Sequence, residues 1–319
     1  MKTKQVLGID ISKQKFDVAL LKDTKLKHKK FPNNRKGFTA LFEWLVHHDA
    51  ASAHVCMEAT GIYSEALSVF LHDQRMTISI VNPARIKGFA QSELLRSKTD
   101  KVDAGLIARF CAAMNPQQWH PQPMQIRQLR DLARRLEALN QMHQQESNRL
   151  EGASEMITSH LQHHLTFLVQ EIKQLKAQIQ QHIDQHPDLK QRKRLLQSIP
   201  GIGEATINVI LSEFGNITQF RNAKALAAFI GVAPKIRQSG TSLRPRATMS
   251  KMGRSSLRKA FFMPALVALR YNPLIIELKK RLTAAGKSKM AIVGAAMRKL
   301  VHIIYGVLKN KLPFDENFA

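Results

Sequence analysis

The order of strand and helix signals in residues 5 to 115 limits the fold of this chain more than any other feature. Two apolar, β-rich stretches, VLGIDIS and FDVALLK, flank the polar turn Lys13-Gln14-Lys15 and predict a hairpin. The more polar LKHKKFP adds a third strand. After it come a helix (GFTALFEWLVHH), a strand (AHVCMEA), a helix (SEALSVFLHD), a strand (TISIVNP) and a helix (KVDAGLIARFCAAM).

A β-meander followed by alternating helices and strands is the order of an RNase H-like domain. Order alone is a weak signal, because many α/β domains share pieces of it. We predict an α/β RNase H-like (RuvC-like) N-terminal domain over residues 1–120.

Apolar side chains continue through residues 125 to 195 in alternating three- and four-residue steps, which predicts two long amphipathic helices. Gly152 lies near the middle of this segment, and Pro187 bounds the second helix. The pair forms either a hairpin or an intermolecular coiled coil. We assign residues 121–195 to a helical connector that serves oligomerisation. The residues that carry the pattern are Leu129, Leu132, Leu136, Leu139, Leu161, Leu165, Leu168, Ile172, Leu175, Ile179 and Ile183.

Residues 196–319 predict a second, mainly helical domain. Its start, SIPGIGEATINVILSEFG, has the pattern of a helix, a Gly-rich turn and a second helix. This is either a helix-hairpin-helix element, in which Gly201 and Gly203 let the backbone approach a phosphate, or an ordinary turn between helices. From about Ser255 the chain is helical, with interruptions at Pro264, at residues 272–273 and at Gly286.

The charge balance favours a polyanionic partner. The chain has 49 Lys and Arg against 24 Asp and Glu, a net charge of +25, and a pI near 10.4. Nucleic acid is the commonest soluble polyanion. An anionic membrane is the rival partner. However, no apolar run approaches the length of a spanning helix, and MKTKQVLGID has no signal-peptide core. Cys56 and Cys111 are too isolated for a disulfide framework or a zinc site, which indicates a cytoplasmic protein.

The positive charge is concentrated in the second domain. Between Glu213 and Glu277 there is no acidic residue, although eleven Lys and Arg occur. A solvated helix face normally mixes the two signs, so a phosphate-binding surface is favoured. The residues that we expect to bind nucleic acid are Arg237, Arg244, Arg246, Lys251, Arg254, Arg258 and Lys259, together with Gly201 and Gly203.

Four acidic residues are candidates for catalysis. Asp10 lies inside an apolar strand and Glu58 ends another, while Asp100 and Asp103 project from one face at the start of a helix. An unpaired buried charge in a strand is expensive, which favours a functional role. The helix pair has a second reading, since the macrodipole stabilises acids in a first turn and Ser97 with Asp100 resembles a capping box.

The four carboxylates could converge at one edge of the sheet, where they would need a counter-charge. Two Mg²⁺ ions about 4 Å apart supply it, activating the attacking oxygen and stabilising the leaving oxygen of a phosphodiester. Asp17 is a rival to Asp10, although its setting at the head of the second strand allows it to point outward.

Residues 236 to 246, IRQSGTSLRPR, have three arginines and three hydroxyls but no acid. Such a loop grips a phosphate backbone, or one of its serines attacks that backbone. A serine hydroxyl needs a base or a positive field to become a nucleophile, and neighbouring arginines provide such a field. The residues alone leave both readings open.

The motifs GIDISKQKFDVAL, MEATGIY, KTDKVDAGLIARF, SIPGIGEATI and GVAP…QSGTS…MSKMGRSSLRKAFFMPALVALRYNP occur here in an order that resembles the DEDD-type insertion-sequence transposases. These are the bridge-RNA-guided serine recombinases, a family that also includes the Piv-type DNA invertases. The resemblance covers both globular domains, and the central helices match only in character.

The resemblance implies a set of functional residues and partners. The four acids of the RuvC-like domain fall on Asp10, Glu58, Asp100 and Asp103, and the serine nucleophile falls on Ser239, with Ser242 as its competitor and Thr241 as a phosphate ligand or bystander. It also implies Mg²⁺, donor and target DNA, a structured bridge RNA and a homodimer or homotetramer with a composite active site. We therefore expect a transposase. The alternatives are an invertase of the same family, a RuvC-type metal-dependent nuclease and a non-catalytic nucleic-acid-binding protein.

Overall fold

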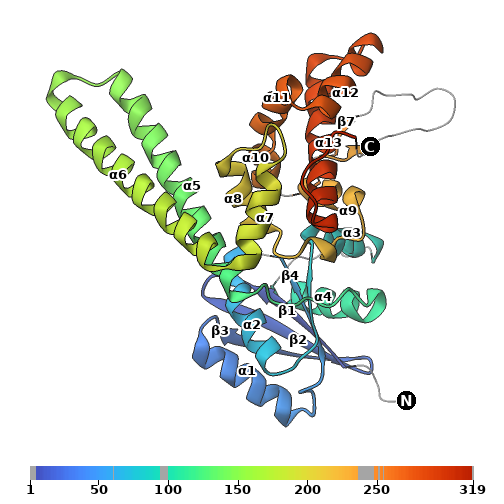
Figure 1. The fold of residues 1–319 in the computed structure, drawn as a ribbon. Helices are drawn as coiled ribbons and strands as arrows, with labels where there is room; N and C mark the ends of the chain where they lie inside the picture. The colour runs from blue at the N-terminus through green and yellow to red at the C-terminus, as the bar shows by residue number, and fades with distance from the viewer. Residues whose placement is uncertain are drawn as a thin grey trace. The chain divides into compact units, whose positions relative to one another are not determined.

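The chain forms two compact units, Met1–Pro121 and Gln122–Ala319, each of which is described by itself. The structure, a computed structural model, describes residues 5–59, 61–93, 100–235, 248–250, 252–253 and 255–317, without the side chains of residues 62, 100 and 101. The first unit is a mixed α/β domain and the second is mainly helical (Figure 1), which confirms the predicted fold class at this level.

A five-stranded mixed sheet forms the centre of the first unit, in the order β3-β2-β1-β4-β5. The predicted hairpin and third strand are confirmed, because β1, β2 and β3 form an antiparallel meander. The two later strands lie parallel to β1, with β4 next to it. The strands are β1 (Val6–Ile11), β2 (Lys15–Lys22), β3 (Lys25–Pro32), β4 (His54–Glu58) and β5 (Ile78–Val81).

Helices cover both faces of this sheet. Ile9 and Met57 pack with α1 (Arg35–His47) and α2 (Glu65–Asp73), whereas Val6 and Cys56 pack with α3 (Pro83–Ser92) and α4 (Asp100–Met114). The third helix was not predicted. Its signal is local, since Asn82 caps it by accepting a hydrogen bond from the Ala84 amide at 2.8 Å and Pro83 occupies its first position.

The central segment folds into a helical hairpin of α5 (Met124–Glu151) and α6 (Glu155–Gln185), which pack against each other within one chain (Figure 1). Gly152 ends the first helix, as its place in the sequence indicated. Leu129, Leu139 and Ile183 belong to the same hydrophobic cluster as the C-terminal helices. The central helices therefore share a core with residues 196–317, across the boundary that we expected at 195/196. A coiled coil between subunits stays a prediction.

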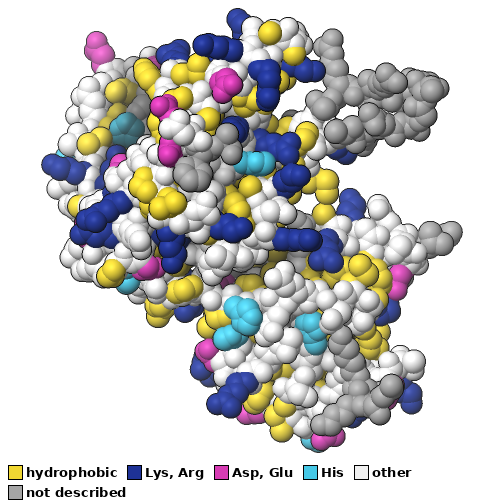
Figure 2. Space-filling model, turned by 45° about the vertical axis from the view of Figure 1, so that its right-hand side comes forward, with side chains coloured by type: hydrophobic (Ala, Val, Ile, Leu, Met, Phe, Trp, Pro, Cys, Tyr) yellow, Lys and Arg dark blue, Asp and Glu magenta, His cyan; other side chains and the backbone are white. Residues whose placement is uncertain are grey.

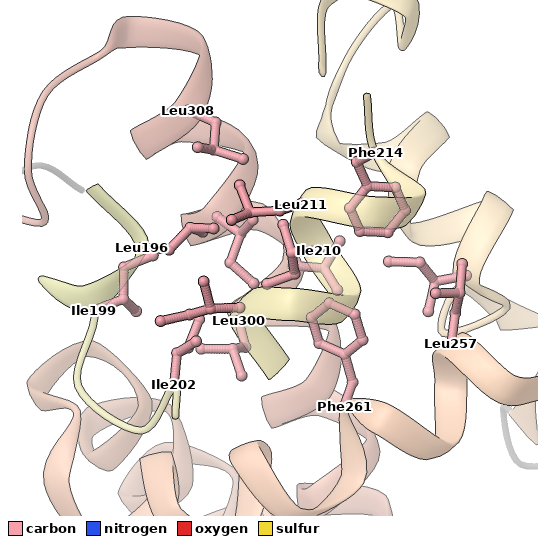
Figure 3. Close-up of a cluster of buried hydrophobic side chains, with 14 of the residues drawn as sticks. Leu196, Ile199, Ile202, Ile210, Leu211, Phe214, Leu257, Phe261, Leu300 and Leu308 are labelled. Carbon is pink, nitrogen blue, oxygen red and sulfur yellow. The ribbon is translucent and has the colours of Figure 1, made fainter. Parts of the chain in front are cut away.

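The C-terminal part of the second unit packs around two helices, α8 and α13. Figure 3 shows Ile210 and Leu211 of α8 directed toward Leu300 of α13, beside Phe261. These side chains are all buried and leave the polar faces outward. The helices are α7 (Pro187–Gln197), α8 (Glu204–Glu213), α9 (Ala223–Ile230), α10 (Ser255–Ala260), α11 (Phe262–Tyr271), α12 (Pro273–Ala284) and α13 (Lys289–Asn310).

The last helix is more apolar than the sequence analysis allowed. By length and composition α13 could cross a membrane, and 56% of its most apolar window is buried inside the protein. Its buried side chains include Leu300, Val301 and Ile304, which belong to the core of the second unit. Burial in this core explains the apolar composition without a membrane.

Candidate active site and nucleic-acid interface

Asp10 and Glu58 lie side by side at the carboxyl ends of two neighbouring parallel strands. The register pairs Ile9 of β1 with Met57 of β4, and the two acids are the next residues of each strand. In a parallel pair, neighbours at equal register have side chains on the same face. Ile9 and Met57 are fully buried on the opposite face, while both acids are half-buried.

The N-terminal end of α4 lies over the same face. A Cβ atom on Gly8 would lie 2.2 Å from the Ala104 oxygen, so only glycine allows this approach of helix to strand. Val6, nearer the start of β1, packs with residues further along α4, such as Ile107. The helix therefore runs back along the strand, and its first turn, with half-buried Asp103, lies toward Asp10.

These acids have the right chemistry for a hard divalent cation, because carboxylate oxygens are the ligands that Mg²⁺ prefers. Asp10 and Glu58 also lie where two carboxylates could share one ion. Over the described part of the chain, however, no three His, Cys, Asp or Glu side chains come together closely enough to hold a metal. The Asp100 side chain lies outside that part. The predicted four-acid magnesium site therefore stays a prediction.

Asp17 shares the face of Asp10 and does not point outward. The two residues are direct partners across the β1–β2 hairpin, so their side chains lie on the same side of the sheet. The Asp17 side chain is only 13% exposed, and its carboxylate lies 3.3 Å from Lys30 Nζ on β3. The sequence did not give this pairing, because it depends on the register of the hairpin, in which Ile11 pairs with Phe16.

The segment with the candidate nucleophile lies in the sequence between the two strands of a short β-ribbon. In this ribbon β6 (Pro234–Lys235) pairs with β7 (Thr248–Met249), and Lys235 is the partner of Thr248. Residues 236–247 lie outside the described residues. The predictions for Ser239, Ser242, Thr241, Arg237, Arg244 and Arg246 fall on that segment, and those for Lys251 and Arg254 fall on two further residues outside the described part.

Close backbone packing supports the base of this ribbon. A Cβ atom on Gly253 would lie 2.6 Å from the Gly231 nitrogen, so the two glycines bring their chains into direct contact. The Arg258 side chain also reaches Gly231, at 2.8 Å from a Cβ built there. Lys259, the next residue on α10, is exposed. Of these two predicted nucleic-acid ligands, Lys259 has the more open side chain.

The Gly-rich turn connects α7 and α8, as predicted, and its two glycines have different surroundings. Gly201 has φ +99°, and a Cβ atom there would lie 2.8 Å from Ala268 Cβ on α11. Packing alone explains this glycine. Gly203 precedes α8, is exposed and has open space around a built Cβ. Phosphate binding stays a prediction for both, and Gly203 has the accessible backbone.

Comparison with known proteins decides the family. Residues 7–158 match the DEDD IS110-type transposase model, and residues 193–280 match that of the IS116/IS110/IS902 transposase family. The chain is 36% identical over 317 residues to the pilin gene-inverting protein of Moraxella bovis, with 98% of each chain covered. This chain belongs to the IS110 transposase family.

Other members of this transposase family match over shorter stretches. An insertion element IS110 protein of Streptomyces coelicolor is 27% identical over 50% of this chain and 38% of its own length. The transposase of insertion sequence IS1111A from Coxiella burnetii is 36% identical over 24% of this chain and 21% of its own. The two family models together span the positions of all four acids and the whole 236–247 segment. The whole of α13 lies beyond them.

Two thiols lie beneath the carboxylate edge of this transposase-family member. Cys56, two residues before Glu58, and Cys111 of α4 are both free and fully buried. A hydrogen bond with Cys111, together with burial, raises the pKa of Cys56 far above its ordinary value. Burial and this hydrogen bond therefore favour the protonated thiol at neutral pH. Neither cysteine takes part in a disulfide in this structure.

Proposed function

We propose that this protein cuts and rejoins DNA strands as a recombinase of a mobile element, with Asp10, Glu58, Asp100 and Asp103 as its carboxylates and Ser239 as its nucleophile. The observation that carries the proposal is the placement of Asp10 and Glu58 side by side, with the first turn of α4 on the same face of the sheet. The strand order β3-β2-β1-β4-β5 supports an RNase H-like assignment for this unit.

The carboxylates would act together with Mg²⁺. When bound, the metal supplies positive charge that activates an oxygen nucleophile and stabilises the leaving oxygen of a phosphodiester. Asp10 and Glu58 would hold it from the strand ends, and Asp103 and Asp100 from the helix above them. Because the strands and α4 hold these residues before substrate arrives, little reorganisation is needed.

The serine would preserve the energy of each broken strand. In the proposed step Ser239 Oγ loses its proton and forms an ester bond to a DNA phosphorus. The bond from that phosphorus to a deoxyribose oxygen breaks, and this oxygen takes up a proton. One phosphodiester replaces another, so rejoining to a new strand needs no ATP. Arg237, Arg244 and Arg246 would stabilise the negative charge of the transition state.

A covalent adduct tests the nucleophile. We expect wild-type protein incubated with DNA and Mg²⁺, then denatured with detergent, to retain DNA on the chain. Ser239→Ala should abolish this adduct and leave DNA binding intact, whereas Ser242→Ala should retain it. An adduct that survives Ser239→Ala but not Ser242→Ala would assign the role to Ser242. Hydrolysed ends without any adduct would indicate a RuvC-type nuclease instead.

Inversion of a DNA segment is the second candidate, because the similarity to the Moraxella pilin gene-inverting proteins extends over 98% of both chains. The two reactions differ in their products. A plasmid that carries the natural flanking sequences should yield either an inverted segment or an insertion at a new site. Recovery of inverted segments alone would assign the protein as an invertase.

We further propose that the protein acts in the cytoplasm, where the bacterial chromosome lies. Two other features of the working form are a guide RNA from the element and assembly into a homodimer or homotetramer. Both follow from family membership and from the net charge of +25. Sequencing of RNA that copurifies with the protein from its host tests the guide, and light scattering tests the oligomer. Absence of element-derived RNA would favour the invertase reading.

A further inference from the structure

We propose that a groove between α11, α12 and the start of α13 binds an unpaired stretch of DNA, with bases on its apolar stripe and phosphates on the surrounding cations. The inference rests on the proposed recombination of DNA. It adds a binding site within the second unit whose lining residues, from Met263 to Val293, include neither the serine segment nor the predicted ligands of α10.

The fold builds this groove with a sharp bend. The chain turns by 87° between Ser255–Tyr271 and Pro273–Ala284. Fully buried Asn272 holds the bend, since its side-chain oxygen accepts from the Ile275 amide and its Nδ2 donates to the Pro200 oxygen, both at 3.3 Å. The cavity volume is about 860 Å³. This lies within the range of about 300–1,000 Å³ that is typical of ligand sites.

An exposed apolar stripe lines one wall. Met263, Val267 and Tyr271 follow one another at four-residue intervals along α11, so they lie on the same face of the helix. Their side chains are 62%, 41% and 66% exposed, and each lines the groove. An open tyrosine ring next to aliphatic side chains provides a surface on which an unpaired base can stack. Duplex DNA keeps its base faces covered and would leave this stripe without a partner.

Cations surround the stripe. Arg270, Lys279, Lys287 and Lys289 all line the groove, and the described lining residues include no Asp or Glu. Figure 2 shows Lys and Arg side chains mixed with hydrophobic ones on the visible face. This combination of cations and stacking surface is typical of sites for single-stranded nucleic acid. A second copy of this chain would have to present an acidic face to these four cations, whereas the phosphates of nucleic acid supply negative charge along their whole length.

Polar groups favour DNA over RNA as the occupant. Apart from the hydroxyls of Thr283 and Tyr271, the described lining side chains offer no oxygen acceptor. Recognition of RNA commonly uses contacts to the 2′-hydroxyl, which is both a donor and an acceptor. The lining therefore offers few acceptors for the proton of a 2′-hydroxyl, and its cations can donate to the phosphates of either nucleic acid. DNA is the expected occupant because its strands separate during the proposed exchange.

Binding of a fluorescent oligothymidylate to the full chain, followed by anisotropy, tests the site. We expect Tyr271→Ala to weaken binding roughly tenfold, and Tyr271→Phe to retain it because the ring remains. Lys279→Gln should lower the slope of log affinity against log salt by about 0.7. The matched control Lys280→Gln should keep that slope, because Lys280 is exposed on the same helix but does not line the groove.

Several results would overturn the proposal. Unchanged binding in Tyr271→Ala would exclude stacking, and equal losses in the Ala and Phe variants would indicate a merely structural role. Oligouridylate bound more than tenfold tighter than oligothymidylate would assign the groove to RNA. A change of oligomeric state in Tyr271→Ala would assign the groove to a second copy of the chain. If Tyr271→Ala still bound oligothymidylate but no longer bound phosphatidylserine vesicles, the groove would be assigned to lipid.

The result is independent of the catalytic proposal, because oligothymidylate binding requires no cleavage. Ser239→Ala should bind the oligonucleotide as the wild type does. If no strand exchange is ever observed but Tyr271→Ala still weakens binding, the groove stands and the recombinase assignment fails. If exchange depends on Ser239 while Tyr271→Ala binds normally, the groove alone fails.

Discussion

The first unit fixes its candidate catalytic groups by strand register, whereas the second attaches its candidate nucleophile through a two-residue ribbon. Asp10 and Glu58 are held by hydrogen-bonded neighbours in β1 and β4, and Asp103 by the close packing of α4 on Gly8. Ser239 instead belongs to a segment whose ends meet at Lys235 and Thr248. The difference separates carboxylates that neighbouring strands and a packed helix place together from a candidate nucleophile whose flanking residues are joined by two register pairs.

Substitution of Asp10 should have the largest effect. Asp10→Asn keeps the shape of the side chain but removes its charge. We expect strand exchange to fall by at least ~10²–10³-fold, the cost of removing one electrostatic contact of a transition state. DNA affinity should be unchanged or higher, since a negative charge near phosphates is lost. Exchange assays and gel shifts measure the two.

Asp17→Asn is the matched control, because Asp17 is the direct partner of Asp10 and is paired with Lys30. We expect its exchange rate to stay within roughly tenfold of wild type, a change of about 1.4 kcal/mol. Equal losses in both variants would mean that the sheet edge responds to overall charge and not to Asp10 as a ligand.

The Gly-rich turn offers an intermediate effect. Gly201→Ala must adopt φ +99° and meet Ala268, so the free energy of unfolding should fall by ~1–3 kcal/mol. Gly203→Ala has space and should cost less than ~1 kcal/mol. Denaturant unfolding compares the two. Weaker DNA binding by folded Gly203→Ala would support a contact between this turn and a phosphate. Unaltered affinity would indicate that the segment is an ordinary turn between two helices.

The smallest expected effect concerns His302 on α13. Burial, followed by Arg298, Lys299 and Lys224, lowers the pKa of His302 below its ordinary value of 6.5. The unfolded chain then binds the proton more readily than the folded chain does. The contribution of neutral His302 to the stability of the folded state is therefore complete above about pH 6.5, and it falls as the pH drops below that value. Because the group is partly exposed, we expect a loss of less than ~1 kcal/mol.

His302→Gln should remove this acid-side loss, as measured by thermal unfolding between pH 7 and pH 5. His160→Gln, at an exposed position on α6, serves as the control and should leave the profile of the wild type. A profile in the His302 variant that still matches the wild type would show that other groups cause the acid sensitivity.

The sequence predicts the elements of the first unit well, because strand alternation and helical periodicity are local signals. Asp10 and Glu58 could be expected at one sheet edge because each lies in or ends an apolar strand. The face of Asp17 was misjudged, since it depends on hairpin register. The Gly201 contact with Ala268 joins residues 67 positions apart, and no local pattern indicates it. For the same reason the groove was missed, since it needs the relative placement of three helices.

The β6–β7 ribbon has a consequence for how such a protein can diversify. Since Lys235 and Thr248 are register partners, the residues on either side of the segment 236–247 lie next to each other. The entropic cost of closing a longer flexible loop grows only with the logarithm of its length, about 0.6 kcal/mol for each doubling. A change in the length of a segment whose ends are paired in this way is therefore expected to cost little loop-closure entropy. We therefore expect relatives of this chain to differ in the length of the segment between β6 and β7 more than in the lengths of the helices of the second unit.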